Sequence, residues 1–292
     1  MNGPGMERTK ELFLRIKELA IPGYRMFQDN RITVYSGYTT LYIVTAIIPF
    51  IILIISIVNL LPGYSAEDFA NLLLQILPDL EPIRKLVEAL VTELKNQTDG
   101  LLASAAAVSA LWAASKGVMA IQNGLIQMDS GADKSRIDEG KSGAIVSTGI
   151  DYAVRVVKRL IFTVVLILLI PAMMVIEVLG DSFAGIIGSV LIILTAFLVI
   201  LQVYARLPTI RRTLRSQIPG AAATVVCWWV FTELFSFFIS GSYRYSTLYG
   251  ALAAVFLLLL WLRYMIMILF AGGILNRVLE SEVMMKEENI LK

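Results

Sequence analysis

Long apolar runs separated by short charged segments make up most of the chain. A transmembrane helix needs about 20 mostly apolar residues to cross about 30 Å of hydrocarbon. The run that begins near residue 37 meets this length, since no charge stands between Arg31 and Glu67. The second run is the weakest because it is rich in alanine and contains Lys116. The pattern predicts an all-α polytopic membrane protein, a single membrane domain over residues 1–292 with six transmembrane helices at about 37–61, 101–125, 160–176, 182–205, 218–239 and 246–269.

Two segments outside these runs have the spacing of amphipathic helices. Residues 6–31 form a predicted N-terminal cytoplasmic amphipathic segment, whose first helix is expected to end at Pro22-Gly23. This segment lies either on the inner membrane surface or on the protein's own loops. Residues 65–98 predict a pair of extracytoplasmic helices, the first of them capped by Ser65. This pair either caps the outer end of the bundle or dips into the outer leaflet.

Composition and charge support a membrane location. The chain is 57% hydrophobic and 16% charged, whereas soluble domains are about 25% charged. Lys and Arg number nineteen in the segments that this topology puts inside and four in those that it puts outside. Cytoplasmic segments carry such an excess, so both termini are predicted to be cytoplasmic. A net charge of +2 gives no reason to expect nucleic acid as a partner.

Few groups in this chain could perform the usual chemistry of enzymes. There is no histidine, which removes the commonest general base and the commonest metal ligand. Cys227 is the one cysteine, so no disulfide can form within the chain. The sequence contains no GxxxxGK[ST] pattern for phosphate binding, and its acidic residues lack metal-ligand spacing. We therefore expect a protein that is not an enzyme and that has no cofactor and no metal site.

Three charged residues stand inside predicted spans, where charge is costly and often functional. Lys116 and Arg263 fall near the inner side, where they form either an anionic site or cations that snorkel to the headgroups. Glu233 falls in the outer half of its span, so it is expected to lie too far in depth from Arg263 to pair with it. Its short side chain favours a cavity-facing carboxyl over snorkelling.

Hydroxyl groups follow one stripe of the first span. Tyr35, Tyr38, Tyr42 and Thr45 share a helix face that also reaches Pro49. An aromatic anchor at the inner interface explains the first two residues but not the deeper ones. Because unpaired hydroxyls are unfavourable in lipid, the stripe predicts a face that lines the bundle interior or an inward-open cavity.

Five segments resemble, in order, motifs of the YihY/BrkB family of bacterial inner-membrane proteins: YSGYTTLYIVTAIIPF (35–50), LWAASKGVMAIQNGL (111–125), VYARLP (203–208), PGA (219–221) and YGALAAVFLLLLWLRYMIMIL (249–269). The resemblance covers almost the whole chain. It singles out, as candidates for binding or packing, Trp112, Ser115, Pro208, Pro219, Gly220, Tyr249, Gly250, Trp261, Gly272 and Asn276. One motif departs from the family, since GGILN (272–276) has Ile274 where the family's Gly-Ala-Glu-x-Asn has an acid.

The resemblance implies six transmembrane helices in a bacterial plasma (inner) membrane. Members have been labelled ribonuclease, virulence factor or serum-resistance factor. The ribonuclease label finds no support here, because the basic residues follow the membrane topology and do not gather into a groove.

The leading hypothesis is a secondary transporter or lipid-handling protein. Its inner-side cavity, lined by the first span, Lys116 and Arg263, would accept an anionic amphiphile, and Pro49 and Pro171 would supply helix breaks. Membrane lipids, including anionic ones, are the expected partners. Two alternatives stay open: a non-transporting scaffold that binds an envelope partner protein, and an ion-coupled exchanger that works through Glu233. Homo-oligomers are compatible with each.

Overall fold

The computed structural model describes residues 21–58, 65–96, 100–130, 186–208, 212–242 and 250–291. Within these ranges the chain is helical and contains no strand. The seven helices are α2 (Ile32–Val58), α3 (Ala66–Ile76), α4 (Glu81–Asn96), α5 (Gly100–Ser130), α8 (Ile186–Arg206), α9 (Leu214–Ser242) and α10 (Gly250–Leu291). The all-α prediction is therefore confirmed for the described part. The predicted span 160–176, with Pro171, and most of the N-terminal amphipathic segment lie outside the described residues, as does Tyr249.

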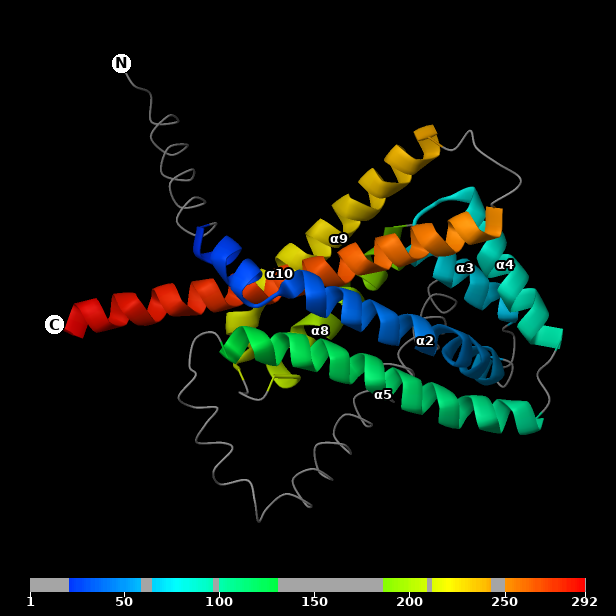
Figure 1. Cartoon of the computed structure of the whole chain (residues 1–292), viewed down its shortest axis with the longest axis horizontal. Coiled ribbons are helices and arrows are strands. Elements are labelled where there is room, and N and C mark those ends of the chain that lie inside the picture. Colours follow the sequence, from blue (N-terminus) through cyan, green and yellow to red (C-terminus); the bar gives the residue numbers. More distant parts are fainter. Residues whose placement is uncertain are drawn as a thin grey trace, which may run out of the picture.

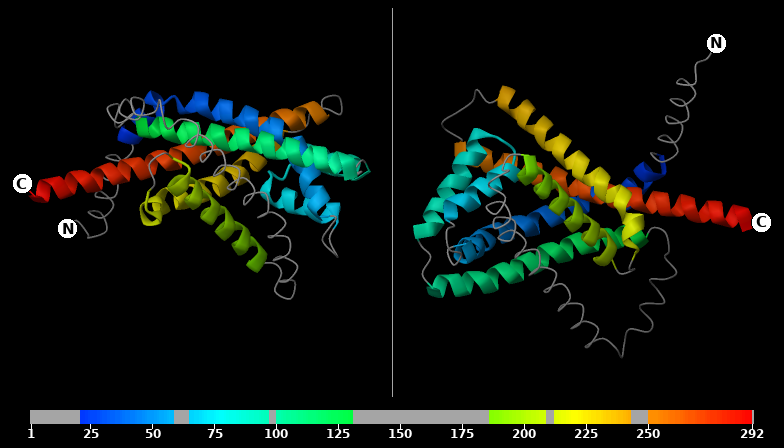
Figure 2. Two further views of the ribbon diagram at one scale, coloured as in Figure 1. Left: turned by 90° about the horizontal axis from the view of Figure 1, so that it is seen from below. Right: turned by 180° about the vertical axis from the view of Figure 1, so that it is seen from behind.

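The long helices pack in the order α5, α2, α10, α9 and α8, so α10 lies in the middle of the bundle (Figure 1). Helices α2 and α5 run antiparallel, because the Tyr35 hydroxyl meets the Gln127 side chain near one end and Gly117 faces Ile43 further along. Helices α8 and α9 lie on the other side of α10, as the two turned views in Figure 2 show.

Two helices are long and apolar enough to cross a membrane, over Leu214–Ile239 and Leu252–Glu282. Shorter apolar stretches cover Ile32–Ile47 and Ile192–Arg206. The apolar part of α10 thus continues well past the predicted end at 269. The helix itself continues to Leu291, and its polar residues Asn276 and Arg277 are buried. The number of six spans and the topology stay predictions.

Prolines end fewer helices than the sequence suggests. Residues 21–29 are helical, so the predicted helix end at Pro22-Gly23 is wrong. Helix α2 continues through Pro49 and α9 through Pro219. The break before α2 comes instead at Arg31, whose φ of 51° is left-handed and ends the preceding helical segment. The Asn30 side chain donates a hydrogen bond to the Met26 carbonyl at 2.8 Å, which stabilises this turn.

Two apolar clusters hold the helices together. The first, here called the α4 core, joins the end of α2 and the α3–α4 pair to α9 and α10 through Ile54, Phe69, Ile83, Phe235 and Trp261. The α3–α4 pair therefore packs against the bundle, the first of the two arrangements that its amphipathic pattern allows. The second, here called the α8 core, joins α2, α5, α8, α9 and α10 through Ile32, Leu125, Ile200, Ala221 and Phe270.

Candidate functional site

Helices α9 and α10 approach each other most closely at Gly220 and Gly272. A Cβ atom built on Gly272 would lie 2.7 Å from the Tyr204 hydroxyl oxygen and 2.8 Å from the Gly220 carbonyl oxygen, and it would collide with the Thr224 hydroxyl. A Cβ on Gly220 would collide with the Gly272 carbonyl and with Asn276. Only glycine fits at both positions, since small residues let two helix backbones come this close.

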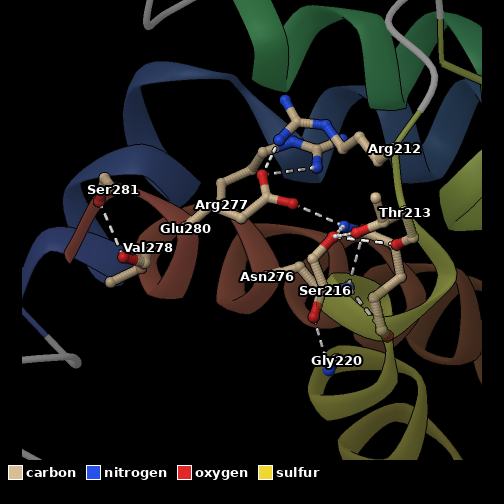
Figure 3. Close-up of polar contacts among 10 residues, drawn as sticks. Arg212, Thr213, Ser216, Gly220, Asn276, Arg277, Val278, Glu280 and Ser281 are labelled. Carbon is tan, nitrogen blue, oxygen red and sulfur yellow. Dashed lines mark hydrogen bonds and ion pairs between the residues drawn. The ribbon is translucent and has the colours of Figure 1, made fainter. Parts of the chain in front are cut away.

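Asn276 joins α10 to the first turns of α9 (Figure 3). Its buried side chain accepts a hydrogen bond from the Gly220 amide at 2.7 Å. It donates to the Gln217 carbonyl at 3.3 Å and to the Gln217 side-chain oxygen at 3.1 Å. Gln217 is also buried, and its amide nitrogen donates to Glu280 at 2.7 Å. One asparagine thus satisfies backbone and side-chain groups that burial would otherwise leave unpaired.

Tyr204 adds α8 to the same contact. Its hydroxyl lies 2.7 Å from the Thr224 hydroxyl and donates to the Leu269 carbonyl of α10. Thr224 in turn donates to the Gly220 carbonyl at 2.8 Å. Both side chains are buried. Each hydroxyl has one proton, and both protons are directed at backbone carbonyls, of Leu269 and of Gly220. The name crossing cluster is used below for Tyr204, Gln217, Gly220, Thr224, Gly272 and Asn276.

An ion-pair group borders the crossing cluster where α9 begins. Arg212 forms an ion pair with Glu280, and the two side chains are 19% exposed. Arg277, whose side chain is 7% exposed, lies 3.6 Å from the same carboxylate. Glu280 also accepts the Gln217 bond, so one carboxylate links both arginines to the crossing cluster. Removing it would leave the buried Arg277 and the half-buried Arg212 without this counter-ion, which is destabilising.

The resemblance found part of this site and missed the rest. Gly220, Gly272 and Asn276 were candidates, whereas Tyr204, Gln217, Thr224 and the ion-pair group were not. A signal was present in the spacing: Gly272, Asn276 and Glu280 recur every four residues and so share one face of α10. Polar residues that repeat at helical spacing beside a glycine indicate a helix contact, and this pattern in α10 was not recognised from the sequence alone.

Lys116 lies about midway along α5. Its side chain is half-buried, and its ammonium nitrogen is 5.5 Å from the centre of the Trp112 ring, a cation–π distance. Trp112 is 68% exposed and Ser115 is half-buried. No acidic side chain in the described part of the chain pairs with Lys116, and no described contact joins it to Arg263. The structure therefore brings Lys116 to Trp112 and not to the second cation.

The hydroxyl stripe of α2 lies on a different face than expected. Tyr38 and Thr45 are exposed, whereas Tyr35 and Tyr42 are half-buried. The side chains that are buried in the bundle are those of Ser36, Thr39 and Thr40. These small side chains allow close approach, and two of them satisfy their hydroxyls on backbone carbonyls of their own helix, at 2.9 Å for Ser36 and 2.7 Å for Thr40.

The prediction that the tyrosine stripe packs into the bundle is therefore corrected for Tyr38 and Thr45. Tyr38 is too large for the close contact that the small hydroxyl residues make, and Thr45 is exposed with its hydroxyl bonded to the Tyr42 carbonyl at 2.8 Å. The alternative prediction, that the stripe lines a cavity, is not tested. Tyr35 reaches the Gln127 side chain of α5 at 3.5 Å, and the Tyr38 and Tyr42 rings stack edge to face at 4.8 Å.

Glu233 and Arg263 are both exposed, on α9 and α10. The helices run antiparallel, with Trp228 Nε1 donating to the Met265 carbonyl at 2.7 Å and Trp261 Nε1 donating to the Thr232 hydroxyl at 3.2 Å. This register puts residue 233 level with residues 260–263. The prediction that Glu233 and Arg263 lie too far apart in depth to pair is therefore wrong about their depth, because the hydrogen bonds between α9 and α10 put them nearly level.

The remaining candidates have simple positions. Trp261 is buried in the α4 core, Pro208 is buried directly after α8, and Pro219 is exposed in the second turn of α9. Gly250 is the first residue of α10. Among the described residues, no group of three or more Cys, Asp or Glu side chains could hold a metal ion.

Comparisons with known proteins cover nearly the whole chain. Residues 24–291 match the family model described as virulence factor BrkB. The chain is 27% identical over 296 residues to a Bacillus subtilis (strain 168) protein named as ribonuclease-like protein YfkH, a match that covers 97% of this chain and 99% of that protein. No solved structure matches. The resemblance to the YihY/BrkB family is confirmed, and the chain belongs to the virulence factor BrkB family.

Proposed function

We propose that this protein is a secondary transporter or lipid-handling protein that moves an anionic amphiphile, and that it is not an enzyme. It would do so in a bacterial inner membrane with both termini in the cytoplasm, as the distribution of Lys and Arg predicts. The observation that carries the proposal is Lys116, a half-buried cation midway along α5 with an exposed tryptophan beside it.

A cation at this position needs an explanation. In the predicted span 101–125, Lys116 follows the outer end by fifteen residues and precedes the inner end by nine, which is about 14 Å along the helix axis. A lysine stem covers only part of that distance, so snorkelling does not bring the charge fully to the aqueous side. Ionisable groups this deep in a span mark substrate pathways, and an ammonium group next to an aromatic ring suits an anionic headgroup on an apolar tail.

The arrangement of the bundle is compatible with transport. The crossing cluster ties α8, α9 and α10 into one unit through buried hydrogen bonds. Helices α2 and α5 form a second closely packed pair, in which Gly117 lies against Ile43, and the two apolar cores join this pair to α10. Two units that rock against each other around a site near the membrane midplane are the usual basis of alternating access. Lys116 belongs to the α2–α5 pair.

The test is transport of labelled lipid in vesicles that contain the purified protein. Lys116→Met should lower the rate for a labelled phosphatidylglycerol about fivefold, since one Lys contributes about 1 kcal/mol to the attraction of an anionic headgroup. Lys116→Arg should keep most of the rate because it keeps the charge. The matched control is Lys85→Met, which removes an exposed lysine that pairs with Glu81 on α4.

The outcomes separate the alternatives. A Lys116→Met protein that transports at the wild-type rate would remove the observation on which the proposal rests. Wild-type protein that moves no lipid at all would favour the scaffold that binds an envelope partner. Transport that follows an imposed pH gradient and stops in Glu233→Gln would favour the ion-coupled exchanger.

A further inference from the structure

We propose that neighbouring copies of this protein associate side by side in the membrane, with Glu233 of one copy paired with Arg263 of the next. Both side chains are exposed in the single chain, and neither has an ion-pair partner among the described residues. The proposal depends on three features of the α9–α10 pair: similar depth, opposite direction and apolar surroundings.

The two charges have nearly the same depth. The hydrogen bonds of Trp228 to Met265 and of Trp261 to Thr232 put Glu233 opposite residue 260 of α10. Arg263 lies three residues from that position, about 4.5 Å along the helix axis. The contact of Phe231 with Tyr264, with ring centres 5.5 Å apart, confirms that these levels nearly coincide. Copies of a membrane protein share one orientation, so charges at similar depth within one chain also meet at similar depth between chains.

The two charges point in opposite directions. At 100° per residue, Glu233 is rotated by about 120° from the middle of the α9 side that faces α10, on which Trp228 and Thr232 lie. Arg263 is rotated by about 180° from the middle of the α10 side that faces α9, on which Trp261 and Met265 lie. They therefore cannot pair within one chain. In a neighbouring copy, Arg263 can pair with Glu233 of the first copy, and Glu233 of another neighbour can pair with Arg263 of the first copy.

Apolar side chains surround each charge. On α9, Trp229, Val230 and Phe237 are exposed next to Glu233. On α10, Phe256 is exposed on the same face as Arg263, from which it is seven residues distant. A carboxylate and a guanidinium within such surfaces are unfavourable when they face lipid one by one, and a pair of them satisfies both charges. Because the two faces differ, the contact is head-to-tail and generates a ring or a row of copies.

Cysteine cross-linking next to the two charges tests the contact while both charges are kept. Val230→Cys lies one turn from Glu233, and Met267→Cys lies one turn from Arg263 on the same face. In a Cys227→Ser background, proteins with one of these cysteines are mixed in lipid vesicles and treated with a short bifunctional thiol reagent. We expect cross-linked dimers in the mixture and none with either protein alone. A Leu198→Cys protein, with its cysteine on the exposed face of α8, replaces the Val230→Cys partner as the control.

Charge reversal decides whether the ion pair holds the contact. Glu233→Arg should reduce the cross-linked fraction about tenfold, the factor that corresponds to 1.4 kcal/mol. Glu233→Arg combined with Arg263→Glu should restore it. Cross-linking that is unchanged by Glu233→Arg would overturn the ion pair. Absence of the dimer with unaltered charges would overturn the association and leave lipid or another protein as the group that covers these faces.

Discussion

The two halves of the α9–α10 pair are held together by different kinds of contact. In the half near Gly220 and Gly272, the backbones touch, and buried side chains such as Asn276 satisfy the polar groups between them. In the half near Trp228 and Trp261, large aromatic rings separate the backbones and contribute apolar area with few hydrogen bonds. The first half has no space for any added atom, whereas the second has large rings whose shape can adapt.

This difference explains where polar groups can be used for function. Within the crossing cluster each polar side chain is committed to a neighbour, so a change there affects the fold before it affects any ligand. In the aromatic half the charges of Glu233 and Arg263 are exposed and uncommitted within the described chain. Stability should therefore depend most on the first half, and association or transport on the second half and on Lys116.

Adding one methyl group at the crossing should have the largest effect. Gly272→Ala would bring a Cβ atom onto the Thr224 and Tyr204 hydroxyls, and we expect it to lower the free energy of unfolding by about 3 kcal/mol, the upper range for overpacking. The measurement is unfolding in mixed micelles by SDS titration, followed by circular dichroism. The matched control is Gly37→Ala in α2, where a Cβ meets nothing within 4 Å and helix propensity should add about 1 kcal/mol. Equal stability of the two variants would contradict the close contact.

Removing the asparagine amide should have the next largest effect. Asn276→Leu keeps a similar volume but leaves the Gly220 amide and the Gln217 side chain without their partner, at an expected cost of about 2 kcal/mol. The same SDS titration measures it, with Asn71→Leu on the exposed face of α3 as the control. Adding Gln217→Leu to Asn276→Leu should cost less than the sum of the two single changes, because both belong to one network. Strict additivity would show that the network does not act as a unit.

The smallest effect is expected in the aromatic half. Trp228→Phe keeps a ring in the contact but loses part of its apolar area and the hydrogen bond to the Met265 carbonyl, which between membrane helices is worth about 0.6 kcal/mol. Trp229→Phe changes the exposed neighbouring ring and should leave the unfolding free energy unaltered. If Trp228→Phe were as damaging as Asn276→Leu, the proposed contrast between the two halves would be wrong.

Several local features followed from the sequence. The amphipathic spacing of residues 65–98 predicted the α3–α4 pair, and the long apolar runs predicted α2, α5, α8, α9 and α10. Helix periodicity and hydrophobic length are local properties, so they can be read without knowing which helices are neighbours. The family resemblance added Gly220, Gly272 and Asn276, although it did not show that the three meet at one point.

Other features depended on the neighbours of each residue. The sequence predicted that a stripe including Tyr38 and Thr45 faces the bundle interior or a cavity, whereas Ser36 and Thr40 are the buried residues because α2 packs closely. The relative depth of Glu233 and Arg263 was predicted wrongly because it depends on the register of α9 against α10, which the hydrogen bonds of Trp228 and Trp261 set.

By itself, the sequence determined that this chain is helical, that it belongs in a membrane and that a few polar groups lie within its apolar helices. These conclusions rest on composition and periodicity, which do not depend on packing. Only the tertiary structure decided which polar groups are paired. It joined Gln217 to Asn276 across 59 positions of sequence and turned Glu233 away from Arg263 at nearly the same depth. The physical reason is that a hydrogen bond or ion pair depends on the register and rotation of two packed helices, which neither helix specifies alone.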